Sequence, residues 1–174
     1  MPQLDIVYPE GISFEHNYWE NTFFKLQVAN CVQYEKIIFL DSDMIIMDNI
    51  DHLFEKEHGS AVAAGNAVNW DYNNLNSGLM VIMPNKNFYN VLISNIQAAM
   101  VRRFNQGYNV SDQDVFQENL SDWTERDELH LPEKYNCYYH EMYQVCKKLK
   151  YKHKDIYVIH FSGAIKPWSG GHFS

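Results

Sequence analysis

The feature that most constrains this chain is the stretch from Lys36 to Met44, where an apolar run ends at two aspartates, Asp41 and Asp43. Residues 37–40 are large or β-branched and do not alternate with polar residues, which predicts a strand covered on both faces, as in parallel sheets of α/β proteins. Ligands of such sheets bind beyond the carboxyl ends of strands, so the two carboxylates indicate a binding site. Like charges this close repel unless a cation or a proton neutralises them. The alternative is that two acids simply end a strand and begin a turn.

Composition places the chain among globular proteins. Its 174 residues, 46% hydrophobic and 15% aromatic, suffice for one core, so a single domain over residues 1–174 is expected. A net charge of −8 without a basic cluster disfavours nucleic-acid binding. The sequence shows no membrane span and no secretory signal, so we expect a cytoplasmic protein. The three cysteines lack Cys-x-x-Cys spacing and are interpreted as packing residues, with one disulfide as the alternative.

Predicted helices and strands alternate along the chain, which favours an α/β fold with a mostly parallel sheet flanked by helices. Strands are expected at residues 4–7, 37–40, 61–64, 79–83 and 156–159, with an extended segment at 129–132. Helices are expected at residues 17–34, 86–103 and 141–149, with others beginning near residues 48 and 112. The segment 135–139 is interpreted as a loop.

The last predicted strand ends in His160, a third candidate ligand. Two carboxylates and one imidazole leave about three positions open on an octahedral cation, enough for diphosphate oxygens and water. The nitrogen ligand shifts the expected ion from Mg²⁺ toward Mn²⁺. His160 is one of eight histidines in the chain, and a purely structural hydrogen bond is the alternative interpretation for it alone.

Short blocks spread over nearly the whole chain form one pattern: Lys25-Leu26 and residues 34–43, 48–54, 76–79, 111–114, 131–136 and 160–168. In this order they resemble the retaining glycosyltransferases of family 8, the glycogenin and galactinol synthase group. The resemblance implies a Rossmann-like GT-A fold. It also implies metal-dependent transfer of a hexose or pentose from a UDP-sugar to a carbohydrate or similar hydroxyl acceptor, with retention of configuration.

The same resemblance assigns site residues by position. The metal ligands would be Asp41, Asp43 and His160, holding Mn²⁺ or alternatively Mg²⁺. The donor-binding residues would be Lys25, Asn76, Ser77, Gly78, Gly163 and Lys166, with Lys166 as a cation on charge that grows as UDP leaves. The residues near the reacting carbon would be Asp112, Gln113 and Asp114.

Elementary chemistry agrees with this separation of metal- and phosphate-binding residues from residues near the sugar. Departure of UDP produces a diphosphate anion and a sugar cation, so the site needs positive charge on one side and electron-rich oxygen on the other. Gln113 is a poor nucleophile, which favours a same-face reaction through a short-lived oxocarbenium ion; double displacement on Asp114 is the alternative. Ser111 and Asp114 also have capping-box spacing, and a helix cap explains Asp114 equally well.

The sequence departs from the family at its front. Members of the family begin with a β-α-β unit that cradles the uridine, and this chain starts just before the helix that precedes the Asp-x-Asp strand. It is interpreted as a catalytic domain incomplete at its N-terminus, either a fragment of a longer chain or a reduced domain that binds its donor weakly. An uncovered sheet edge predicts poor stability or a homo-oligomer. Residues 66–76 and 125–139 are expected to form the acceptor site.

Two other functions stay open from the sequence. A phosphatase of the haloacid dehalogenase type also places Asp-x-Asp after an apolar strand and would use Asp41 and Asp43. Such an enzyme needs Thr or Val soon after the second aspartate, where this chain has Met44 and Ile45. The other hypothesis is a non-catalytic protein that binds a sugar nucleotide.

Overall fold

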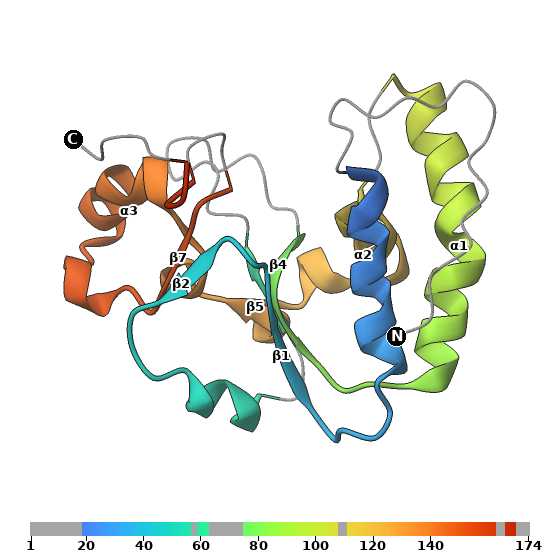
Figure 1. Cartoon of the computed structure of the whole chain (residues 1–174), viewed down its shortest axis with the longest axis horizontal. Coiled ribbons are helices and arrows are strands. Elements are labelled where there is room, and N and C mark those ends of the chain that lie inside the picture. The colour runs from blue at the N-terminus through green and yellow to red at the C-terminus, as the bar shows by residue number, and fades with distance from the viewer. Residues whose placement is uncertain (1–18, 57–58, 63–74, 108–110, 163–165, 170–174) are drawn as a thin grey trace.

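The computed structural model describes residues 19–56, 59–62, 75–107, 111–162 and 166–169 (Figure 1). Three features predicted from the sequence lie outside them: the strand at residues 4–7, the donor-binding Gly163, and most of the loop at residues 66–76. Among the described helices, none is long and apolar enough to cross a lipid bilayer.

From residue 19 on, the predicted elements occur in the order expected, together with an additional strand at residues 44–46 and several 3₁₀ helices (η). They are η1 (Trp19–Asn30), β1 (Ile37–Leu40), β2 (Met44–Ile46), η2 (Asp51–Glu55), β3 (Gly59–Val62), β4 (Leu75–Ile82), α1 (Lys86–Asn105), α2 (Asp112–Asn119), η4 (Trp123–Glu125), η5 (Asp127–Leu129), β5 (His130–Leu131), η6 (Glu133–Tyr135), β6 (Cys137–Tyr138), η7 (Tyr139–Glu141), α3 (Met142–Leu149), η8 (His153–Asp155) and β7 (Val158–His160). The first helix is thus of 3₁₀ type, and the segment interpreted as a loop contains β6.

The strands form two mixed sheets, so the α/β class is confirmed but the prediction of a mostly parallel sheet is wrong for the described strands. One sheet has the order β1-β4-β3-β5 and the other β2-β7-β6. The pairs β1–β4, β3–β4 and β2–β7 are antiparallel, whereas β3–β5 and β6–β7 are parallel. A continuous apolar run indicates burial on both faces of a strand but not the direction of its neighbours, because an antiparallel strand buried on both faces has the same pattern.

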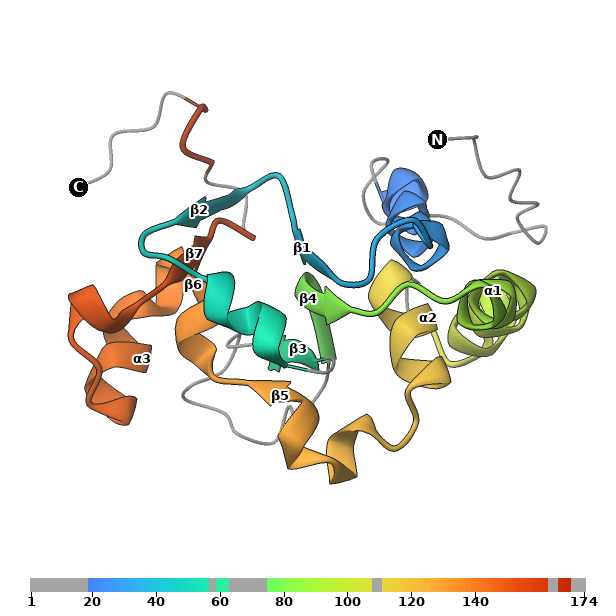
Figure 2. The ribbon, with the colours of Figure 1, turned by 90° about the horizontal axis from the view of Figure 1, so that it is seen from below.

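Strand β4 lies at the centre of the molecule and is buried along its whole length. Met80 and Ile82 pack in a core with the apolar face of α1, whereas Leu79 and Val81 pack in a second core on the opposite face. Figure 2 shows α1 and α2 on one side of the strands and α3 on the other. Helix α1 begins where Asn85 accepts hydrogen bonds from the backbone amides of Asn87 and Phe88.

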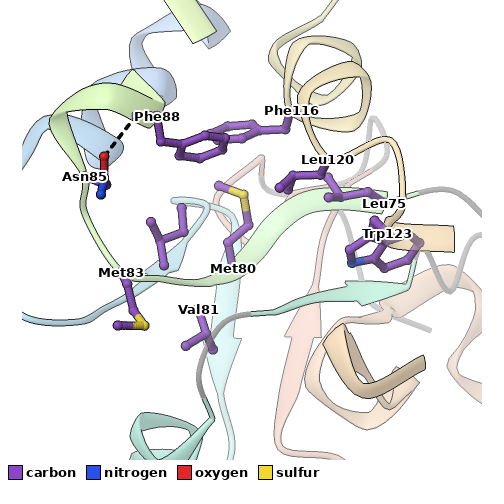
Figure 3. A pocket seen from close by; sticks show the side chains of 10 residues that line it. Leu75, Met80, Val81, Met83, Asn85, Phe88, Phe116, Leu120 and Trp123 are labelled. Atoms are coloured by element: carbon purple, nitrogen blue, oxygen red, sulfur yellow. Dashed lines mark hydrogen bonds between the residues drawn. The ribbon is translucent and has the colours of Figure 1, made fainter. Parts of the chain in front are cut away.

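A cavity of about 260 Å³ lies between β4 and the helices (Figure 3). Its lining is apolar except for one asparagine: Leu75, Met80, Val81, Ile82, Met83, Asn85, Phe88, Phe116, Leu120 and Trp123. The cavity is partly open, and its lining comes from β4, α1, α2, η4 and the segments that connect them.

The antiparallel pairings decide which residues meet at the end of β1. Leu40 pairs with Leu79, and the amide of Asp41 donates to the carbonyl of Gly78 at 2.8 Å. A parallel β4 would instead have brought its first residues to the start of β1. In the second sheet Met44 pairs with His160, which brings the end of β7 beside the two aspartates.

Candidate functional site

The three predicted metal ligands come together at the ends of β1 and β7. One oxygen each from Asp41 and Asp43 and one ring nitrogen of His160 all lie within 4.8 Å of one another. Oδ1 of Asp43 lies 3.3 Å from Nε2 of His160. Carboxylate and imidazole ligands at this spacing suit a single Mn²⁺ or Mg²⁺, so the residues present fit the expected ion.

Two lysines flank the carboxylates. Nζ of Lys25 lies 2.8 Å from Oδ1 of Asp41 and 3.4 Å from Oδ2 of Asp112. Nζ of Lys166 donates to Oδ2 of Asp43 at 2.6 Å and to the carbonyl of Phe161. Three carboxylates against two ammonium groups leave this cluster one negative charge in excess when His160 is neutral. The cluster is therefore an electrostatically favourable place for a further cation.

Burial and these contacts shift the pKa values of three groups. Burial raises the pKa of Asp41, and the neighbouring Lys25 opposes that effect only in part. Burial also acts to raise the pKa of Asp43, but Lys166 and the protonated form of His160 outweigh it and hold that pKa well below its usual range. Burial lowers the pKa of Lys25, yet attraction by Asp112 and Asp41 leaves it above its ordinary value. Asp43 and Lys25 are therefore charged at neutral pH.

The predicted sugar-side residues also converge, because the start of α2 packs against the first residues of β4. Oγ of Ser77 donates to Oδ2 of Asp112 at 2.7 Å. Oε1 of Gln113 accepts from Nδ2 of Asn76 at 3.0 Å and from the amide of Ser77 at 3.3 Å. An amide oxygen has two lone pairs. Gln113 therefore offers its amide nitrogen, rather than its oxygen, to a ligand.

Asp114 makes the contacts of a helix cap. Its Oδ2 accepts from the amide of Ser111 at 2.8 Å and from Oγ of Ser111 at 3.1 Å. Ser111 and Asp114 form a capping box at the start of α2. Its Oδ1 accepts from Nε of Arg103 at 2.9 Å. These contacts match the interpretation drawn from the spacing, and they do not involve the metal ligands. A catalytic role for Asp114 stays a prediction.

Gly78 is the point where the two sides of the site touch. A Cβ atom at this position would lie 2.7 Å from Cε of Met44, 2.8 Å from Cε1 of His160 and 2.9 Å from Oδ1 of Asn76. Real Cβ contacts are not this short, so only glycine fits without movement of its neighbours.

Two further site residues escaped the sequence analysis. Asn136, which is 0% exposed, contacts both Asn76 and His160. The hydroxyl of Tyr138 accepts from Nδ2 of Asn76 at 2.9 Å, and its ring packs edge-on against His160. Asn136 belongs to the block 131–136 that carried the resemblance, but no chemistry was attached to it. Tyr138 lies in the aromatic segment interpreted as a loop.

An α/β fold with a possible metal site beside a polar network is consistent with the glycosyltransferase class that the sequence resembles, and comparison with known families supports that class. The family model described as glycosyl transferase family 8 matches residues 9–171. Because that match covers most of the chain, the protein belongs to glycosyl transferase family 8.

Curated relatives are longer than this chain. Glycogenin-1 of Mus musculus is 34% identical over 149 residues, which cover 85% of this chain and 42% of that protein. The UDP-glucuronate:xylan alpha-glucuronosyltransferase 2 of Arabidopsis thaliana is 30% identical over 159 residues, which cover 87% of this chain and 24% of that protein. The chain thus spans between about a quarter and two fifths of their lengths.

Solved structures show the same fold. An active-site mutant of LgtC superposes with a TM-score of 0.68 at 14% identity, over 94% of this chain and 66% of that one. The glycosyltransferase GlyE of Streptococcus pneumoniae gives a TM-score of 0.61 at 17% identity, over 91% of this chain and 40% of that one. The GT-A fold implied by the resemblance is confirmed, and the phosphatase hypothesis is left without support.

Proposed function

We propose that this chain forms the metal- and sugar-binding part of a retaining glycosyltransferase that moves a hexose or pentose from a UDP-sugar to a carbohydrate or similar hydroxyl acceptor. The observation that carries the proposal is that a possible metal site and a group of polar residues suited to a sugar lie next to each other. The triad Asp41, Asp43 and His160 lies beside Lys166, while Asp112 and Gln113 lie on the other side of Gly78. A metal triad alone would fit many functions, whereas this pairing suits a charged leaving group attached to a sugar.

On the metal side, the chain's residues are suited to a diphosphate. The expected Mn²⁺, when bound, would act as a Lewis acid toward the diphosphate oxygens. Lys166 already lies against Asp43 at the edge of the triad. Its ammonium group would stabilise negative charge that grows on the diphosphate as the sugar departs. Gly163, which lies outside the described residues, is proposed to meet the same phosphates.

On the sugar side, the buried carboxylate of Asp112 is the electron-rich group best placed near a developing sugar cation. It is 3% exposed, and its Oδ2 is held by Ser77 and approached by Lys25. Gln113 has its amide oxygen engaged and would donate to a sugar hydroxyl instead. This arrangement favours the same-face reaction, in which acceptor attack and UDP departure share one side of the sugar. Double displacement on Asp114 has no such support, because Asp114 caps α2.

The test is Mn²⁺-dependent release of UDP from UDP-glucose, UDP-galactose or UDP-xylose, with GDP-sugars and EDTA as negative conditions. The expected result is release with at least one UDP-sugar, its loss with Asp43→Asn, and a product of retained configuration by NMR of the anomeric proton. If none of these UDP-sugars raises the melting temperature in the presence of Mn²⁺, the proposal is contradicted. Calorimetric donor binding without turnover, across many acceptors, would select the non-catalytic alternative.

A further inference from the structure

A chain of buried side-chain amides connects the sugar side of the site to the metal side, and a backbone amide fixes its direction. The N–H of Gly78 donates to Oδ1 of Asn76 at 3.0 Å. A backbone N–H can only donate, so the oxygen of Asn76 must be the atom that faces it. The amide nitrogen of Asn76 therefore lies on the other side, where it donates to Gln113 and Tyr138.

The next link fixes the orientation of Asn136. Its Nδ2 donates to Oδ1 of Asn76 at 2.6 Å, so its own oxygen points the other way, toward Nδ1 of His160 at 2.8 Å. A carbonyl oxygen can only accept, so Nδ1 must carry a proton. In the neutral imidazole the other nitrogen, Nε2, then has the free lone pair. Nε2 is the atom that lies 3.3 Å from Asp43, on the side of the metal triad.

We propose that Asn136 is a positioning residue that holds His160 in the tautomer and ring orientation needed to bind a divalent cation through Nε2. The inference rests on the proposed function, in which the triad binds metal. His160 is 4% exposed and Asn136 is 0% exposed, so water does not readily replace the amide. Tyr138 restrains the ring further, with centroids 5.2 Å apart and an interplanar angle of 83°. Outer partners of this kind typically change metal affinity by about 10–100-fold.

The first test compares two substitutions at one position by Mn²⁺ titration, with free Mn²⁺ measured by electron paramagnetic resonance. Asn136→Leu has a similar volume but removes both polar atoms, and the Kd for Mn²⁺ is expected to rise about 10–100-fold. Asn136→Asp keeps an acceptor for Nδ1 but loses the donor to Asn76, so its Kd for Mn²⁺ is expected to lie closer to the wild type than that of Asn136→Leu. Asn95→Leu is the matched control, because it breaks an amide pair with Asn119 between α1 and α2, away from the triad; no change in Kd is expected.

The second test reads the tautomer directly and needs neither metal nor activity. Long-range ¹H–¹⁵N NMR of the neutral imidazoles separates Nδ1–H from Nε2–H forms, and the spectrum of His160→Gln assigns the signal among the eight histidines. The wild type, Asn136→Asp and Asn95→Leu should all show Nδ1–H at His160. Asn136→Leu should lose this preference. If Asn136→Leu does not fold, the His160 tautomers of the wild type and of Asn136→Asp decide the matter.

Two results would overturn the inference: an Nε2–H tautomer at His160 in the wild type, or an unchanged tautomer and Mn²⁺ affinity in folded Asn136→Leu. Failure of the wild type to bind Mn²⁺ would instead contradict the proposed function. The NMR tautomer separates these two failures, because it is measured on the metal-free protein.

Discussion

The two ends of β4 differ in how they are stabilised, although all eight of its residues are buried. At its start, Asn76 and Ser77 have buried polar side chains. These side chains are hydrogen-bonded to residues of α2, to Asn136 and Tyr138, and to the backbone of Gly78. Toward its end, Met80 and Ile82 line the partly open apolar cavity, which Leu75 also lines from the first position of the strand. Figure 3 shows Met80 and Leu75 in this lining. Among the described residues, Nε1 of Trp123 in that lining is a buried donor without a partner.

The difference separates function from stability along one strand. A buried amide is costly unless it is paired, so the closed network at the start of β4 fixes one set of side-chain orientations. The later residues contribute by apolar burial, which depends on volume and tolerates imperfect packing. Substitutions at the two ends should therefore affect different measurements.

The largest expected effect is on stability, from the apolar end. Phe116 is 1% exposed and lines the cavity, so Phe116→Ala should lower the free energy of unfolding by about 3–5 kcal/mol. At a temperature where this variant stays folded, its Mn²⁺ affinity should equal that of the wild type. Urea unfolding and Mn²⁺ titration measure the two quantities. Loss of Mn²⁺ affinity in the folded variant would remove the separation between the two ends.

The next effect is on turnover, from the metal side. Lys166→Met should lower kcat for UDP release by about 10²–10³-fold, because it removes the cation that we propose stabilises the leaving diphosphate. Lys86→Met is the matched control, since Lys86 bonds Asn30 and lies over the ring of Tyr89, outside the site. Equal activities of the two variants would show that Lys166 has no part in stabilising the leaving group.

A smaller, mixed effect is expected at Gly78. The added methyl of Gly78→Ala collides with Met44, His160 and Asn76, so it should cost about 1–3 kcal/mol and also weaken Mn²⁺ binding. Gly107→Ala is the control: Gly107 has φ +77° and no atom near its missing Cβ. There the cost should be about 1–2 kcal/mol of backbone strain, with Mn²⁺ binding unchanged. Identical Mn²⁺ affinities in the two variants would contradict the close approach at Gly78.

The smallest effect tests a polar residue at the apolar end. Asn85→Ala removes the cap of α1 and should cost about 1 kcal/mol, without altering Mn²⁺ affinity. Asn87→Ala, which keeps its backbone donor to Asn85, should have little effect on thermal unfolding. A cost at residue 87 that matches the cost at residue 85 would argue against side-chain capping.

Much of this arrangement could be predicted from the sequence. Hydrophobic periodicity located α1, a short helix was expected where α3 lies, and the Ser111–Asp114 spacing indicated the cap that α2 possesses. The resemblance brought Asp41, Asp43 and His160 together although more than a hundred residues separate them. These features depend on local patterns or on blocks that a family shares.

The rest depends on pairing that a local pattern does not encode. An apolar run specifies burial but not strand direction, so the antiparallel contact between β1 and β4 was missed. Lys25, in η1, forms an ion pair with Asp41, and Lys166, which follows β7, forms one with Asp43. Only the fold shows which carboxylate each lysine contacts. The sequence alone does not single out Asn136, because its proposed role depends on its contacts with Asn76 on one side and His160 on the other.

The central claim is that the ends of β1 and β7 form one divalent-cation site beside a diphosphate site. Mn²⁺ titration of the wild type, Asp43→Asn and His160→Gln, each with and without UDP, tests it most directly. The account predicts one Mn²⁺ per wild-type chain, tighter binding when UDP is present, and loss of both effects in the two variants. Wild-type binding that is no tighter than that of folded Asp43→Asn, or that is indifferent to UDP, would contradict it.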